Sequence, residues 1–186
     1  MSKRYGIFID GSNLYASAKA LGFRVDFTKL LNYYKGMGDV AHAMYFTALP
    51  PKTENTPLRM MTDFVEFNGY ILIQKETKEF IDANGRKKLK GNMDVEIAVH
   101  AGEVAHSITN LVLYSGDGDF CCLIESLQRR HGVHCTVVSA RSLTADSLRR
   151  QANDYVDLAD LRRQLNHDEQ VVTAEVRAKR FKFLSN

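Results

Sequence analysis

The sequence predicts an α/β fold in which a mostly parallel central sheet is flanked by helices on both faces. Short apolar runs alternate with longer amphipathic patterns along the 186 residues. This alternation is typical of parallel strands joined by helical crossovers. The length and a hydrophobic content of 45% suffice for one domain with a well-formed core. We therefore expect one domain over residues 1–166, followed by a tail over 167–186.

The first half of the chain predicts three strands and three helices. Residues 5–9 are bulky and β-branched, as in a buried strand, and the polar turn that begins at Asp10 starts a helix. Asp26 is expected to cap a second helix, which ends at Gly36. The further elements are a strand over 40–47, a helix over 58–68 after a Pro-rich loop, and a strand over 70–73.

The second half predicts a hairpin and two more strands with their helices. Alternation over residues 75–91, with Asn84-Gly85 at its centre, is typical of a hairpin. The elements that follow are a helix over 93–107, a strand over 111–114, a helix over 120–131, a strand over 133–138, and helical and short extended pieces over 142–165.

Carboxylates follow two strands of the predicted sheet and begin one helix. Asp10 follows the first strand, Asp117 and Asp119 follow the fourth, and Asp94 begins a helix. Ligands of open parallel sheets bind beyond the carboxyl ends of the strands, so we expect these acids to converge. Carboxylates in one cleft repel one another unless a cation is present, and oxygen ligands favour magnesium or manganese over zinc. The sequence therefore predicts a site for Mg²⁺ or Mn²⁺.

Each acid alone also has a structural explanation. Asp10 can cap a helix, Asp117 and Asp119 can belong to a Gly-rich turn, and Asp94 can complement a helix dipole. Their convergence at one sheet edge favours a functional site. Divalent ions held by carboxylates promote hydrolysis of phosphodiesters, which is the expected reaction class. The amide of Asn13 would orient a water molecule or a phosphate oxygen.

Four segments carry a resemblance to a known family. They are residues 8–15 (FIDGSNLY), 90–99 (KGNMDVEIAV), 114–120 (YSGDGDF) and 147–155 (SLRRQANDY). With these segments, the chain resembles the NYN domain of the LabA-like family, a branch of the PIN-like nucleases. The resemblance implies a PIN-like three-layer fold for the domain over 1–166 and a metal-dependent ribonuclease activity. It assigns metal binding and catalysis to Asp10, Asp94, Asp117 and Asp119, with Asn13 supporting them.

One position departs from the family pattern. Many relatives have an acid six residues after the residue that matches Asp94, and this chain has His100 there. Six helical residues turn through about 600°, so His100 would flank the site, about 120° from Asp94, behind the metal ligands. Three explanations stay open: a tolerated variation, a metal preference shifted towards Mn²⁺, and a weakened or lost activity.

Basic and hydroxyl side chains near the acids are the candidate contacts to RNA. Such bases bind phosphates without sequence preference and with an affinity that falls with salt. A solvated hairpin and an ordinary helix surface are the alternatives for these positions. The candidate substrate-binding residues are Ser12, Ser115, Arg86, Lys87, Lys88, Lys90, Arg149 and Arg150.

Aromatic side chains could stack on the bases of single-stranded RNA. The candidates are Tyr15, Tyr45 and Phe46, and core packing is the better explanation for the last two.

The net charge of the chain lies in its tail. Four basic residues and one acid fall within residues 171–186, which accounts for the formal charge of +3, so the remaining residues are neutral overall. This excludes a uniformly basic coat protein of nucleic acid and an acidic disordered chain. The tail also contains Phe181, Phe183 and Leu184. It predicts an amphipathic element that binds RNA, a partner or its own domain, with an extended exposed tail as the alternative.

The sequence also predicts the compartment. No apolar run approaches the roughly 18 to 20 residues that cross a bilayer, so we expect a cytoplasmic protein that does not bind membranes. Cys121, Cys122 and Cys135 are odd in number and lie in apolar surroundings, which predicts core thiols rather than disulfides.

Together these features predict a metal-dependent endoribonuclease that cuts single-stranded or structured RNA. A non-catalytic or impaired RNA-binding module with the same fold is the alternative, and His100 favours it. A phosphatase with an aspartate nucleophile would require an acid two residues after Asp10, where Ser12 stands. Assembly into a homodimer stays open.

Overall fold

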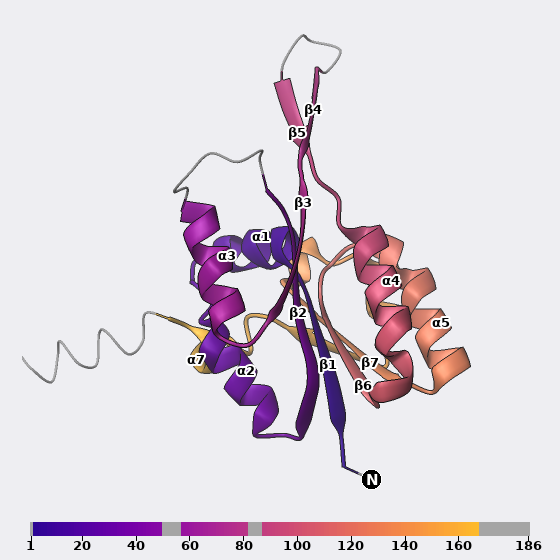
Figure 1. Cartoon of the computed structure of the whole chain (residues 1–186). Coiled ribbons are helices and arrows are strands. Elements are labelled where there is room, and N and C mark those ends of the chain that lie inside the picture. Colours follow the sequence, from indigo (N-terminus) through magenta and orange to yellow (C-terminus); the bar gives the residue numbers. More distant parts are fainter. Residues whose placement is uncertain (1, 50–56, 82–86, 168–186) are drawn as a thin grey trace, which may run out of the picture.

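The computed structural model describes residues 2–49, 57–81 and 87–167. Its centre is a six-stranded parallel sheet with the strand order β3-β2-β1-β6-β7-β8 (Figure 1). The strands are β1 (Arg4–Asp10), β2 (Asp39–Leu49), β3 (Ile71–Glu76), β6 (Asn110–Tyr114), β7 (His134–Ser139) and β8 (Asp154–Asp157). An antiparallel pair, β4 (Lys78–Ile81) and β5 (Lys87–Lys90), projects beyond the sheet. The predicted α/β fold is confirmed.

Helices cover both faces of the sheet. They are α1 (Gly11–Ala20), α2 (Phe27–Lys35), α3 (Pro57–Phe67), α4 (Asp94–Val104), α5 (Cys121–His131), α6 (Asp146–Gln151) and α7 (Arg162–Leu165), with three short 3₁₀ turns, η1 (Ala105–Ser107), η2 (Gly118–Phe120) and η3 (Arg141–Leu143). Helices α1, α2, α3 and α7 contribute side chains to one buried cluster, and α4, α5 and α6 contribute to the other.

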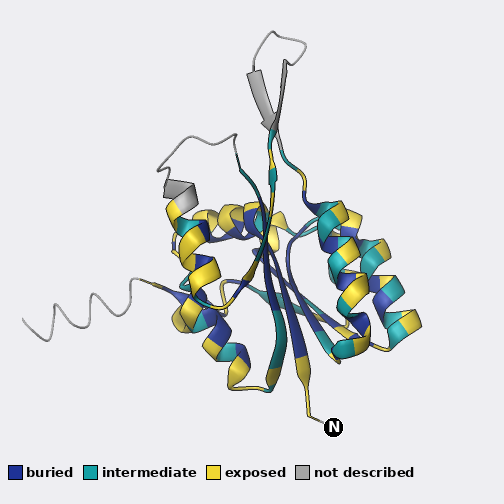
Figure 2. Cartoon of the chain, in the orientation of Figure 1, coloured by how far each residue is buried: buried dark blue, intermediate teal, exposed yellow. Residues whose placement is uncertain are grey.

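The central strand β1 supplies both layers of the core. Ile7 and Ile9 are buried in one cluster and Phe8 in the other, because successive side chains of a strand point to opposite faces. Figure 2 shows the strands at the centre of the sheet as the most deeply buried part of the chain. Fully burying side chains of this size contributes about 1.5–3 kcal/mol each.

The topology places a binding edge between β1 and β6. From β1 the chain continues to β2 on one side, whereas β6 pairs with β1 on the other side. The strand order therefore reverses at this pair, and ligands of such sheets bind beyond the carboxyl ends of the strands at the reversal. Residues that follow Asp10 and Tyr114 meet at this edge.

The local signals that predicted the elements are present in the structure. The carboxylate of Asp26 accepts a hydrogen bond from the backbone N–H of Lys29 and caps α2, as expected. Gly132, whose role as a helix end was not predicted, ends α5 with a φ of 66°, a conformation that favours glycine. The third strand begins one residue later than predicted, at Ile71, and the extended piece around Tyr155 is a sixth strand of the sheet.

The structure tests two predictions about which side chains are buried, one for aromatic residues and one for cysteines. Tyr45 and Phe46 are buried core residues, as favoured, and Tyr15 is 67% exposed. The expectation that all three cysteines are core thiols is wrong, because only Cys135 is buried, whereas Cys122 is exposed on the outer side of α5. All three are free thiols.

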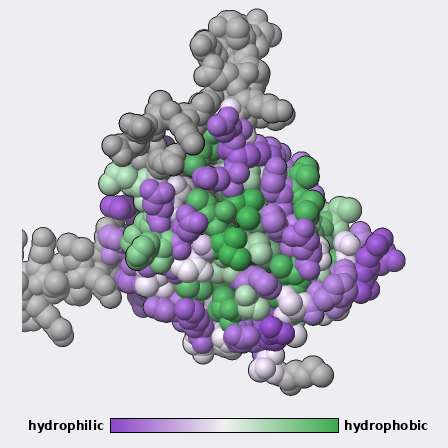
Figure 3. All heavy atoms as spheres, viewed as in Figure 1, coloured by the Kyte–Doolittle hydropathy of each residue, from purple (hydrophilic) through white to green (hydrophobic). Residues whose placement is uncertain are grey.

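The edge strand β3 carries apolar side chains to the surface. On the face in Figure 3, apolar side chains gather between α3 and α4, over β3, and Ile71 is exposed there. Within the described part of the chain, no helix combines the length and apolarity that a bilayer crossing requires. The predicted turn at Asn84-Gly85 and the predicted tail beyond residue 167 lie outside the described residues.

Candidate functional site

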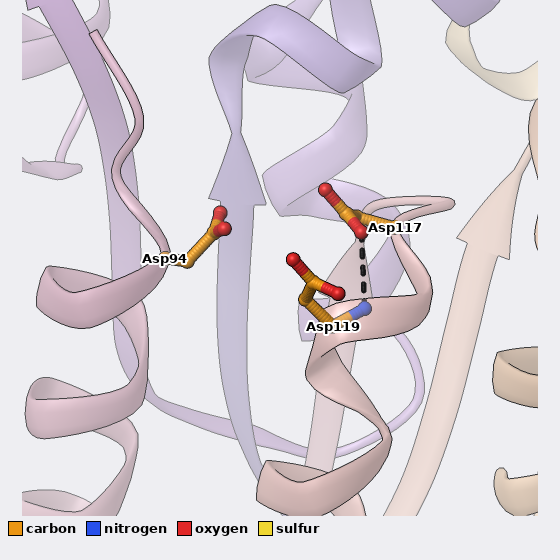
Figure 4. Close-up of side chains that lie close together, drawn as sticks. All are labelled: Asp94, Asp117 and Asp119. Carbon is orange, nitrogen blue, oxygen red and sulfur yellow. Dashed lines mark hydrogen bonds between the residues drawn. The ribbon is translucent and has the colours of Figure 1, made fainter.

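Three carboxylates meet beyond the carboxyl ends of β1 and β6. Asp94 begins α4, Asp117 is the third residue after the end of β6, and Asp119 lies in η2. Their side chains point towards one another (Figure 4), and one oxygen atom from each lies within 4.8 Å of the others. Asp94 and Asp117 are half-buried and Asp119 is exposed, so the cluster opens to solvent. The structure thus brings together three of the four predicted acids.

Short hydrogen bonds hold these acids in place. The Oδ1 atom of Asp117 accepts a bond of 3.0 Å from the backbone N–H of Asp119, which makes Asp117 the cap of η2. Asn92 donates from its amide to Oδ2 of Asp94 (2.6 Å) and accepts from the Asp94 backbone N–H (2.7 Å). The turn role considered for Asp117 is therefore confirmed, Asp94 stands in the first turn of α4, and the hydrogen bonds orient both carboxylates.

Asp10 lies beside the cluster rather than in it. Its carboxylate is buried and accepts five hydrogen bonds: from the backbone N–H groups of Ser12 and Asn13, the hydroxyls of Ser12 and Ser115, and the side-chain amide of Asn13. Among the described residues, the group with the spacing of a metal site does not include Asp10. Direct metal binding by Asp10 stays a prediction.

Asn13 joins the ends of β1 and β6. Its amide nitrogen donates to Oδ2 of Asp10 at 2.7 Å, and its amide oxygen accepts from the backbone N–H of Gly116 at 3.2 Å. The hydroxyl of Ser115 extends this connection, since it donates to Asp10 and accepts from the Asp117 backbone N–H. The structure thus shows Asn13 and Ser115 as braces between the two strands, and their proposed contacts to water or substrate stay predictions.

The electrostatics of the cluster favour a cation. Burial is the largest cause that raises the pKa of Asp94, and the negative charges of Asp117, Asp10 and Asp119 raise it further. The hydrogen bond from Asn92 acts in the opposite direction. A bound cation would offset this repulsion. Three carboxylate oxygens form a hard donor set of the kind that suits Mg²⁺ or Mn²⁺.

We expect Asp94→Asn to stabilise the metal-free protein at neutral pH. Because the pKa of Asp94 is raised on folding, the folded state binds the proton more tightly, and ionisation lowers the free energy of unfolding. The stability difference between variant and wild type should be absent below the usual pKa of 3.8 and should grow as the pH rises through the folded pKa. Thermal melting in chelator at several pH values measures it. A variant less stable than wild type at neutral pH would contradict this prediction.

An ion pair that the sequence did not reveal supports the beginning of α4. The Nζ atom of Lys75, in β3, lies 2.8 Å from both carboxylate oxygens of Glu96. The hydrogen bond from Lys75 is the largest cause that lowers the pKa of Glu96. Glu96 lies two residues after Asp94, so this pair ties the edge strand to the turn of helix that carries a cluster acid.

His100 does not join the acids. Its Nδ1 atom lies 3.0 Å from Oε2 of Glu103, one turn further along α4, and its ring centroid lies 5.9 Å from that of Phe46. Among the described residues, the candidate metal group contains no histidine. The effect of His100 on metal preference and activity stays a prediction.

The predicted basic contacts lie on two elements near the cluster. Lys87, Lys88 and Lys90 are in β5, which leads into α4, and Arg86 is outside the described residues. On α6, the guanidinium of Arg149 lies 2.6 Å from Asp146 and stacks over Tyr155, and that of Arg150 lies 3.9 Å from Asp146. Helix α6 packs against η2, the turn that carries Asp119. Phosphate binding by these residues stays a prediction.

Comparison with known proteins relates the chain to a protein family and to a solved structure. The chain matches the family model described as NYN domain over residues 4–160. Over 163 residues it is 33% identical to the low amplitude and bright protein LabA of Synechococcus elongatus, with 86% of each chain covered. Its fold is similar to the crystal structure of VPA0982, a protein of unknown function from Vibrio parahaemolyticus, with a TM-score of 0.72 and 24% identity over 84% of this chain and 93% of that one. The first two agree with the resemblance carried by the four sequence segments.

Proposed function

Because the chain belongs to the NYN domain family, which resembles PIN-like nucleases, we propose that it is a metal-dependent endoribonuclease of the cytoplasm. The observation that carries the proposal is the cluster of Asp94, Asp117 and Asp119, whose oxygens lie within 4.8 Å of one another. The cluster lies at the strand-order reversal, where ligands of parallel sheets bind. Because Asp119 is exposed and the other two acids are only half-buried, a polymer can approach the cluster from solvent.

The residues of the cluster fit a divalent ion. Asp94, Asp117 and Asp119 would hold Mg²⁺ or Mn²⁺. Such an ion would offset the repulsion between the carboxylates, which contributes to the raised pKa of Asp94. A divalent ion at such a site supplies a nucleophile from water at neutral pH and stabilises the charge that develops on the phosphoryl group. The chain itself fixes the acids: Asn92 orients Asp94, and the Asp117 side chain caps its own turn.

Cleavage of labelled RNA in the presence of different ions tests this function. We expect cleavage of single-stranded or structured RNA with Mn²⁺ or Mg²⁺, loss of cleavage in excess chelator, and recovery when the ion is added back. Cleavage of a DNA strand of the same sequence, measured in parallel, shows whether the reaction requires the 2′-hydroxyl of ribose. Cleavage that continues unchanged in excess chelator would show that the activity does not use the acid cluster.

A non-catalytic RNA-binding module is the second candidate. The observation that favours it is that His100 pairs with Glu103 and contributes no carboxylate to the site. Binding of RNA without cleavage under any divalent ion, together with cleavage gained in His100→Asp, would identify an impaired enzyme. Binding without cleavage in both proteins would identify a pure binding module.

A further inference from the structure

A pocket of about 810 Å³ opens between α1, the loop before α2, and α3. Gly11 and Tyr45 belong to its lining, and Gly11 directly follows Asp10. The three cluster acids do not line the pocket. The pocket is therefore separate from the candidate metal site but begins one residue from the hydrogen-bond network that supports it.

The lining combines apolar walls with accessible aromatic faces. Leu14 and Phe23 form part of the buried wall, and Met60 lies at the mouth. Tyr15 on α1 is 67% exposed and Phe64 on α3 is 50% exposed, so both rings are open to a ligand. The volume falls within the range of about 300–1,000 Å³ that is typical of small-ligand sites.

The charges around the pocket suit an anion. Lys19 lies with its Nζ atom 5.9 Å from the centroid of the Tyr15 ring, and Arg24, which also lines the pocket, is exposed. Among the described residues that line the pocket, the one acid is Asp26, and its carboxylate accepts the N–H of Lys29 as the cap of α2. The pocket is thus lined by aromatic rings and by two cationic side chains, Lys19 and Arg24.

We propose that this pocket holds an unpaired base of the RNA strand whose phosphate lies at the acid cluster. Flat rings beside cations are the surfaces on which bases of single-stranded nucleic acid stack, while Lys19 and Arg24 contact the backbone phosphates. A base inside a duplex is stacked and paired and cannot enter. The inference rests on the proposed function and narrows it, since it makes single-stranded RNA the substrate class.

RNA affinity in the absence of metal tests the pocket independently of cleavage. We expect Tyr15→Ala and Phe64→Ala to weaken binding of a short fluorescent single-stranded RNA, in chelator, by about fivefold to a hundredfold each. Tyr15→Phe keeps the ring and should bind as wild type does. Phe67→Ala is the matched control, because Phe67 is 96% exposed on α3 and does not line the pocket. The affinity for duplex RNA should be the same in all variants.

Crosslinking locates the base directly. RNA that contains thiouridine should crosslink under ultraviolet light to the peptide that carries Tyr15. Crosslinks confined to other peptides, or an unchanged affinity in both alanine variants, would overturn the pocket assignment even if the protein cleaves RNA. If the alanine variants weaken RNA binding but no protein cleaves RNA, the proposed nuclease function is wrong and the pocket assignment stands. If Phe64→Ala converts a dimer into a monomer without changing RNA affinity, the pocket receives a second copy of the chain and the assignment is wrong.

Discussion

Asp117→Asn is expected to lower kcat/KM for metal-dependent RNA cleavage roughly a thousandfold or more. The amide has almost the shape of the carboxylate, and its oxygen can still accept the hydrogen bond from the Asp119 backbone N–H. The substitution therefore leaves the turn intact and removes one of the three charges that would hold the ion. Steady-state cleavage with Mn²⁺ or Mg²⁺ measures the effect. Mn²⁺ should raise the melting temperature of the wild-type protein, and this rise should be smaller in Asp117→Asn.

Asp39→Asn provides a control with the same chemical change. Asp39 is the first residue of β2, at the opposite end of the sheet from the acids, and it pairs with Arg4 on the surface. We expect it to cleave RNA at the wild-type rate, because exposed ion pairs contribute little to stability. Wild-type activity in Asp117→Asn would show that the cluster is not the catalytic site.

Gly116→Ala is expected to lower the free energy of unfolding by about 1–3 kcal/mol and to reduce cleavage. A Cβ atom on Gly116 would overlap the backbone carbonyl oxygen of Leu143 and would lie 2.9 Å from the hydroxyl of Ser139. No rotamer change relieves an overlap with backbone, so β6 and the turn after β7 must move apart. Asp117 follows directly, and the Gly116 N–H is the group that Asn13 holds. Urea unfolding and the cleavage assay measure the two effects.

Gly102→Ala is the comparison for that substitution. Gly102 lies inside α4, and a Cβ atom there would meet nothing within 4 Å. Alanine in a helix interior is favoured over glycine by roughly 0.5–1 kcal/mol, so this variant should be slightly more stable than wild type. Equal destabilisation in both variants would show that the contact with Leu143 is not the cause.

The fold was predictable because its signals are local. The buried strand over residues 5–9 and the Asp26 cap are each specified by a few neighbouring residues. The extended piece around Tyr155 was predicted, but its place as the sixth strand of the sheet was not, since its pairing with β7 defines that place. The order of the strands depends on contacts between distant segments, and those leave no pattern in a single stretch of sequence.

In the candidate site, too, features specified by neighbouring residues were predictable, and features that depend on distant segments were not. The three clustered acids were predictable, because each stands where a strand ends or a helix begins. The position of Asp10 beside the cluster was not, because a carboxylate before Gly-Ser-Asn is equally suited to a metal and to capping its own helix. The pair of Lys75 and Glu96 depends on β3 lying near α4, which only the folded chain shows. Asn92 could have been found, since an Asn two residues before a helical Asp is a common local partner.

The pairing of β1 with β6 also bears on how the protein is made. β1 and β2 are both synthesised before β6, which begins only at Asn110. Until then one edge of an apolar strand, with Phe8 and Ile9, has no neighbour to satisfy its backbone. Such edges recruit strands from other molecules. This edge of β1 is therefore open to pairing with other molecules until β6 has been synthesised.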